Sequence, residues 1–94
     1  MMEMFVRQNQ ELAFRIIEDE AIILTPQDGM LHNLNPVATR IFELANGRRR
    51  IKDIVTSIVE EFAVKDDIAR RDAIRFIEDL AHKKLLVLSS NPAS

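Results

Sequence analysis

The chain of 94 residues contains no cysteine, no tryptophan and no tyrosine, and it has only two glycines and three prolines. The lack of cysteine excludes disulfide bonds and thiolate metal sites and gives no sign of an oxidising compartment, so we expect a cytoplasmic protein. Two glycines cannot form a glycine-rich phosphate loop. Long apolar runs are also lacking, and Arg7, Glu11 and Arg15 interrupt the N-terminal region, which argues against a membrane span and a signal peptide.

The residues that are present are those of one small globular domain. Hydrophobic residues make up 47% of the chain and charged residues 30%, which is too apolar for a disordered chain. The net charge of -2 disfavours binding of nucleic acid through bulk electrostatics. Up to Gly47 the chain has three basic and seven acidic residues, whereas from Arg48 onward it has ten basic and eight acidic residues. A surface for an anionic partner is therefore expected in the second half.

The first third of the chain predicts a three-stranded antiparallel meander. Residues 1–12 show no sustained period and are expected to be a flexible arm. Residues 13–18 alternate with a period of two, and residues 21–24 form a short apolar run. Residues 25–29 contain a proline and an Asp-Gly pair, which favour a chain reversal before an outgoing strand at residues 30–34.

The rest of the chain predicts three helices. Asn35 can cap a helix that begins at Pro36, and Gly47 is expected to end it in a left-handed conformation. Residues 51–62 have a clean amphipathic period, and a third helix is expected to start near residue 66. The apolar stripe of this third helix consists of Ala69, Ala73, Phe76, Ile77 and Leu80.

The order of these elements predicts the fold class. Residues 85–88 are expected to be extended and residues 89–94 to form a disordered tail. Neither the meander nor a single helix can bury its apolar face alone, so the helices must pack on the sheet and on one another. The sequence therefore predicts one α+β domain over residues 13–88.

A set of residues within and between these elements resembles the pattern of a known protein family. From about Phe14 to Val87 they are Leu34-Asn35, Ala38, Ile41-Phe42, Asn46-Gly47-Arg48-Arg49, Ile51, Ile54, Ile58, Phe62, Phe76-Ile77, Leu80 and Leu85-Leu86. In this order they resemble the PqqD family, named after coenzyme PQQ synthesis protein D. Two positions depart from the family pattern. Arg50 stands where a Ser or Thr commonly opens the second helix, and Lys84 stands where a glycine commonly precedes the final leucine pair.

The resemblance implies both a fold and a function. The fold is winged-helix-like, with a three-stranded antiparallel sheet followed by a three-helix bundle. The function is that of a non-catalytic RiPP recognition element, without a cofactor, which captures the leader of a ribosomally made precursor peptide and presents it to a modifying enzyme. In pyrroloquinoline quinone biosynthesis that enzyme is of the radical SAM type, and other family members serve other pathways.

The resemblance also implies that the leader adds as a strand beside the third strand and packs against the third helix. The residues expected to bind it are Met30, Leu31, His32, Asn33 and Leu34 of the strand and Arg70, Arg71, Ile74, Glu78 and Ala81 of the helix. Ile74 and Ala81 lie beside the core stripe on one side of the helix, which suits a leader that is partly hydrophobic and partly acidic. The same pattern is also that of a wider core stripe with solvated arginines.

Other functions stay open as alternatives. A winged-helix protein that binds DNA would use the basic residues Arg48, Arg49, Arg50, Lys52, Arg70, Arg71 and Arg75. Arg48, Arg49 and Arg50 are alternatively a docking site for a partner protein, and an unfilled sheet edge could form a homodimer by strand or domain exchange. Catalysis and metal binding are not expected, because His32 and His82 are the only histidines and lie on different elements.

Overall fold

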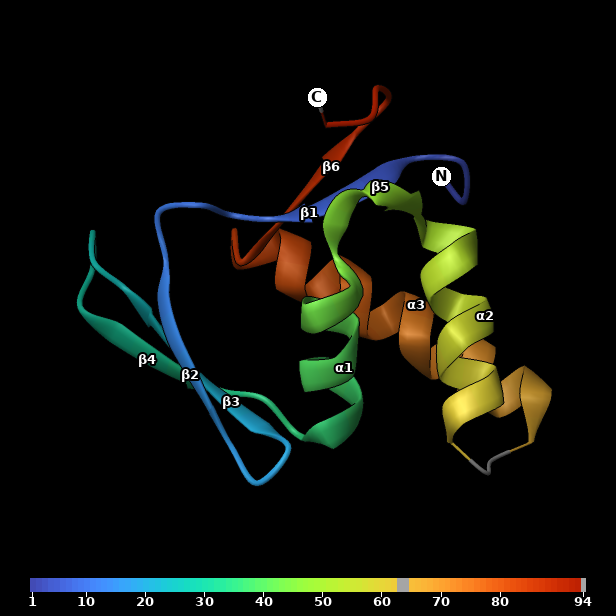
Figure 1. Cartoon of the computed structure of the whole chain (residues 1–94), viewed down its shortest axis with the longest axis horizontal. Coiled ribbons are helices and arrows are strands. Elements are labelled where there is room, and N and C mark those ends of the chain that lie inside the picture. The colour runs from blue at the N-terminus through green and yellow to red at the C-terminus, as the bar shows by residue number, and fades with distance from the viewer. Residues whose placement is uncertain (63–64, 94) are drawn as a thin grey trace.

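The computed structural model describes residues 1–62 and 65–93 of the chain (Figure 1). Its elements are, in chain order, β1 (Phe5–Gln8), β2 (Ala13–Ile17), β3 (Glu20–Thr25), β4 (Met30–Asn33), α1 (Pro36–Leu44), β5 (Asn46–Arg50), α2 (Ile51–Glu61), α3 (Asp66–His82) and β6 (Leu86–Ser89). The fold is α+β, as predicted. Figure 1 shows β2, β3 and β4 beside α1, whereas β1, β5 and β6 lie across one end of the helices.

The first sheet, which we call the hairpin sheet, has the antiparallel order β2-β3-β4 and confirms the predicted meander. The link between β2 and β3 consists of Glu18 and Asp19, with φ angles of 50° and 67°. Positive φ at both central residues is the type I′ geometry that matches the twist of a two-residue hairpin. Ile23 and Ala21 of the central strand are fully buried against the helices.

The second sheet, which we call the terminal sheet, has the order β5-β1-β6 and was not predicted. The expectation of a flexible arm at residues 1–12 is wrong, because β1 is the central strand of this sheet and Val6 is fully buried. A four-residue strand with one buried position has no readable period. The partners that order it, β5 and β6, lie far away in the sequence.

The C-terminal tail and Gly47 also differ from expectation. Ser89 belongs to β6, and the N–H of Ala93 donates to the carbonyl of Gly47 at 2.9 Å, so residues 89–93 are not a free tail, while residue 94 lies outside the described residues. Gly47 does not end the first helix, which ends at Leu44. Its φ of 83° falls within β5, and an added Cβ would lie 2.5 Å from the Cβ of Ala93. Glycine is therefore required there by close packing.

Helix α1 joins the hairpin sheet to the rest of the core. The Asn35 side chain accepts a hydrogen bond of 2.8 Å from the N–H of Ala38, which confirms the predicted cap. On the buried face, the ring of Phe42 meets that of Phe14 edge to face at a centroid distance of 5.0 Å. This contact fixes β2 over α1, and aromatic pairs in this geometry add stability beyond area burial.

Helix α2 begins at a residue that cannot cap it, and its surroundings compensate. Arg50 has no side-chain acceptor, but its own N–H donates to the Asp53 carboxylate at 2.9 Å. The next two amides, of Ile51 and Lys52, donate to the carbonyls of Met4 and Met2 at 2.8 and 3.1 Å. The segment before β1 thus satisfies donors that are otherwise orphaned at a helix start. This explains how the helix begins without a Ser or Thr cap.

Candidate functional site

Strand β4 is an edge of the hairpin sheet, since the sheet order places only β3 beside it among the described residues. The N–H of Leu34 donates to the carbonyl of Ala21 at 2.9 Å. Main-chain groups alternate in direction along an antiparallel strand, so His32 also turns its N–H and C=O toward β3. Leu31 and Asn33 consequently turn theirs away from the sheet, where an added strand can pair with them.

The predicted strand residues divide into an open part and a closed part. Met30 and Leu31 are 55% and 64% exposed, and Asn33 is exposed as well. Leu34 is only 7% exposed, and its N–H is already used. Leu34 therefore belongs to the core, whereas Met30, Leu31, His32 and Asn33 make up the accessible edge.

His32 lies on the face of β4 that turns toward the helices. It is the cross-strand partner of Ile23, which is fully buried, so the two side chains share one face of the sheet. The Nε2 atom of His32 is buried and has no hydrogen-bond partner among the described residues. This atom is an unsatisfied polar group next to the open edge.

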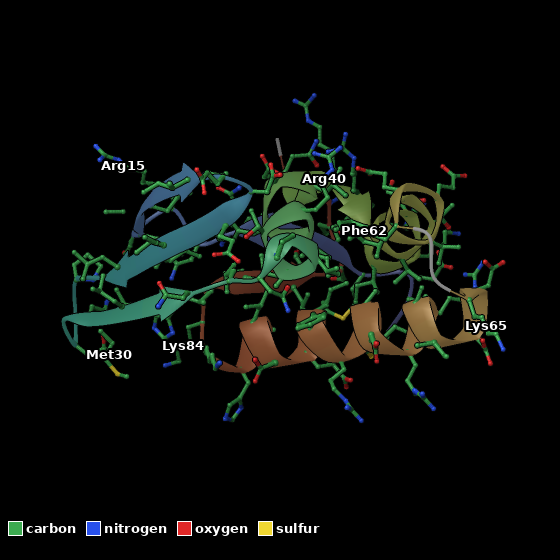
Figure 2. The ribbon with its side chains drawn as sticks, turned by 90° about the horizontal axis from the view of Figure 1, so that it is seen from below. Arg15, Met30, Arg40, Phe62, Lys65 and Lys84 are labelled. Carbon is green, nitrogen blue, oxygen red and sulfur yellow. The ribbon has the colours of Figure 1, made fainter. Side chains whose placement is uncertain are left out.

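Helix α3 lies on the same side of α1 as β4, as Figure 2 shows from below. A surface pocket of about 290 Å³ separates the turn between β3 and β4, at Thr25 and Asp28, from Lys83 and Lys84 at the end of α3. The end of the hairpin sheet and the C-terminal end of α3 are therefore close in space.

The predicted residues of α3 occupy its accessible side. Ile74 and Ala81 are half-buried, and Arg70, Arg71 and Glu78 are exposed. The structure thus brings an apolar shoulder and charged groups to one helix, in the arrangement that the helical spacing implies. Partial burial shows that the shoulder is not wholly free, since Ile74 also packs against the core.

The predicted core stripe of α3 needs one correction. Ala69, Ala73, Ile77 and Leu80 are buried, but Phe76 is only half-buried at the margin of the core. Phe76 therefore packs against the core from its edge and is not enclosed by it. Replacing Phe76 should therefore cost less stability than replacing a fully buried aromatic residue.

The three consecutive arginines lie on β5, in the terminal sheet, and have different surroundings. Arg49 donates to the carbonyl of Leu44 at 3.0 Å. Arg50 lies over the Phe5 ring, with its Cζ 4.8 Å from the centroid, and its Nε is 3.7 Å from a carboxylate oxygen of Glu3. The latter distance is within ion-pair range but too long for a hydrogen bond. Arg48 is exposed and forms no ion pair among the described residues.

A residue that was not foreseen holds the hairpin sheet to α1. Thr39 is 2% exposed, accepts a hydrogen bond of 2.8 Å from the N–H of Ala21 and donates one of 3.2 Å to the carbonyl of Leu34. It thereby ties the central strand and the end of β4 to the helix. A threonine one turn after a helix cap has no distinctive pattern, so only the tertiary contacts reveal this role.

The described residues include no group of three or more His, Cys, Asp or Glu side chains that could hold a metal ion. Across residues 1–62 and 65–93, no helix is both long and apolar enough to cross a bilayer. The chemistry that the site offers is main-chain pairing at the open edge of β4, which has Met30 and Leu31 exposed on it.

The α+β fold of this chain, with two small antiparallel sheets and three helices, is winged-helix-like. Residues 20–86 match the family model of coenzyme PQQ synthesis protein D. The chain belongs to the PqqD family. No curated protein matches the sequence significantly.

Two solved structures are similar to this chain. One is described as TbiB1 in complex with the TbiA(beta) leader peptide; it is 31% identical, with a TM-score of 0.74 over 85% of this chain and 93% of that one. The other is a lasso peptide synthetase B1 complexed with the leader peptide, with 18% identity and a TM-score of 0.73 over 87% of this chain and 96% of that one. The second likeness is one of fold.

Proposed function

We propose that this protein binds the leader segment of a ribosomally made precursor peptide by strand addition to β4. The observation that carries the proposal is the open edge, where Leu31 and Asn33 turn their main-chain groups outward. Main-chain bonds along such an edge supply affinity, and pockets for alternate side chains supply specificity. The 31% identical TbiB1, whose structure holds a leader peptide, supports the proposal.

The predicted binding residues of α3 indicate the kind of leader that fits. Ile74 and Ala81 of α3 offer apolar contact, and Arg70 and Arg71 offer pairing to carboxylates. Glu78 lies on the same accessible side and would contact a basic or polar position. The proposed ligand is therefore an extended peptide with apolar anchors and acidic residues.

The bound peptide is proposed to pass to a peptide-modifying enzyme, of the radical SAM type, in pyrroloquinoline quinone biosynthesis or a related pathway. The chain itself is proposed to be non-catalytic and to act in the cytoplasm. Arg48 is the proposed contact with the enzyme, because it is exposed, whereas Arg49 and Arg50 are engaged within the fold. The alternative of DNA binding is not favoured, since the similar structures hold peptides.

Amide hydrogen exchange tests strand addition directly. The protein is incubated with the TbiA(beta) leader and with synthetic leaders from short reading frames beside its gene. We expect the amides of Leu31 and Asn33 to exchange rapidly in the free protein and slowly in the complex, because only then are they bonded. If a peptide binds without protecting either amide, strand addition at β4 is wrong.

Two proline variants provide a matched control. Leu31→Pro removes an outward N–H from β4, whereas Ile16→Pro removes one from β2, the opposite edge of the same sheet. We expect Leu31→Pro to weaken peptide binding at least tenfold in calorimetry and Ile16→Pro to leave it within about twofold, with both folds verified by circular dichroism. Equal losses in the two variants would contradict the assignment of the edge.

A further inference from the structure

A row of side chains on the inner face of the hairpin sheet ends at its open edge. Phe14 of β2 pairs with Ile23 of β3, and Ile23 pairs with His32 of β4, so the three side chains lie side by side across the sheet. Phe14 is held by Phe42, and Ile23 is fully buried. His32 is the last member of this row. The next place in it belongs to whatever strand pairs with β4.

The buried Nε2 atom of His32 finds no hydrogen-bond partner within this row. Its neighbour Ile23 is apolar, and Nε2 has no partner among the described residues although the atom is buried. An unsatisfied buried polar group costs free energy, so a ligand that supplies the missing partner gains more than one hydrogen bond normally would. A free surface histidine would offer no such gain, because water already bonds to it.

Strand pairing fixes which ligand residue meets His32. The main-chain groups of His32 face β3, so on the open side its pairing with an antiparallel strand is of the non-hydrogen-bonded kind, which brings side chains closest. The ligand residue opposite His32 therefore projects beside the imidazole, on the face of the sheet that packs on α1. Two residues later in the ligand, the side chain meets Met30, which is apolar and 55% exposed.

Resting on the proposed function, we infer that His32 is a specificity-determining residue whose Nε2 forms a hydrogen bond with a serine or threonine hydroxyl of the bound peptide. A hydroxyl can donate or accept and so suits either tautomer of the imidazole. A short side chain fits the close pairing, and burying a hydroxyl costs less than burying a carboxylate. The peptide is expected to carry an apolar residue two positions after the hydroxyl, next to Met30.

Selection from a phage-displayed library of random peptides tests this inference with the full chain. The wild type should enrich Ser or Thr two positions before an apolar residue, whereas His32→Leu should enrich apolar residues at the first position. His32→Leu removes a buried unsatisfied atom and is expected to fold. His32→Gln keeps a hydrogen-bonding group and should retain the preference for a hydroxyl.

One enriched peptide is then measured in a double-mutant cycle. Changing its Ser or Thr to Ala should weaken binding to the wild type about three- to tenfold and leave binding to His32→Leu unchanged. The role of His32 would be overturned if the wild type and His32→Leu selected the same motif. It would also be overturned if the change to Ala weakened peptide binding equally for both proteins. Either result would leave strand addition intact. A wild type that selects no peptide dependent on Leu31 would overturn the proposed function and the inference together.

Discussion

At the scale of single residues, the hydroxyl of Thr39 is placed to hold the site in position. This buried hydroxyl accepts a hydrogen bond from the N–H of Ala21 on β3 and donates one to the carbonyl of Leu34, just after β4. Both strands that define the edge therefore depend on one side chain of α1. A change there should act on stability and, through the position of β4, on peptide binding.

We expect Thr39→Val to lower the free energy of unfolding by about 1–3 kcal/mol, because the isosteric valine leaves the buried N–H of Ala21 without an acceptor. Thr39→Ser keeps the hydroxyl and should lower the free energy of unfolding much less. Urea unfolding followed by circular dichroism measures both, since the chain has no tryptophan to report by fluorescence. Equal stability of Thr39→Val and the wild type would show that these hydrogen bonds contribute nothing.

Lys84 has a backbone conformation that its side chain disfavours. Its φ is 63°, and the N–H groups of Lys84 and Leu85 donate to the carbonyls of Ala81 and Leu80, which is a Schellman ending of α3. Glycine is the usual residue at this place, in agreement with the family pattern from which the chain departs.

We expect Lys84→Gly to raise the free energy of unfolding by about 1 kcal/mol, since it relieves the left-handed strain of a residue with a Cβ. Lys84→Ala is the matched control: it removes the same charge but keeps a Cβ at a φ of 63°, so the left-handed strain is not relieved. Thermal unfolding of the two variants compares them. An equal rise in the free energy of unfolding in both variants would show that the lost charge, and not the backbone strain, is the cause.

At the scale of elements, the turn between β3 and β4 holds the far end of the candidate edge. The Thr25 hydroxyl donates to the Asp28 carboxylate, which also accepts from the N–H of Met30 at 3.0 Å. These two hydrogen bonds, the first being the larger cause, lower the pKa of Asp28 below its ordinary value of 3.8. Gly29, with a φ of 68°, completes the reversal.

The pKa of Asp28 is lower in the folded protein than in the unfolded chain, so its ionised carboxylate stabilises the fold. This contribution to the free energy of unfolding is complete above pH 3.8 and is lost as the pH falls through the pKa of Asp28 in the folded state. NMR titration of the carboxyl carbon should show this lowered pKa. Thr25→Val should raise the pKa toward 3.8, whereas Thr25→Ser should keep it low. An unchanged pKa in Thr25→Val would exclude the hydroxyl as the main cause.

At the scale of the whole molecule, the two sheets have different surroundings. Each sheet has two edge strands, but the tail packs on Gly47 of the edge strand β5 in the terminal sheet, whereas β4 of the hairpin sheet has only β3 beside it among the described residues. Ile22, Leu24 and Leu31, on the face of the hairpin sheet away from Ile23, are partly or largely exposed. An open edge beside exposed apolar side chains favours pairing with another chain.

We therefore expect the protein to self-associate through β4 at high concentration and to dissociate when a leader peptide occupies the same edge. Light scattering over a concentration series, with and without a saturating peptide, measures this competition. Leu31→Pro should remain monomeric throughout. A dimer that persists with saturating peptide, or in Leu31→Pro, would place the contact elsewhere.

Much of the fold could be predicted because its signals are local. The meander follows from alternation and an Asp-Gly turn, and α1 from Asn35 and Pro36, whose cap the structure confirms. Strand β1 could not be predicted, since its order comes from β5 and β6 rather than from its own four residues. Gly47 was wrongly assigned to a helix end because a positive φ serves a helix cap and close packing alike.

The candidate site shows the same division. Periodicity along the chain established the third strand of the meander and the apolar shoulder of the third helix, because adjacent residues create those patterns. Only the tertiary structure decided that β4 is an edge, that Leu34 is closed off and that the Nε2 of His32 is buried without a partner. These properties depend on which segments meet across the fold, and contacts between distant residues leave no period in a single sequence.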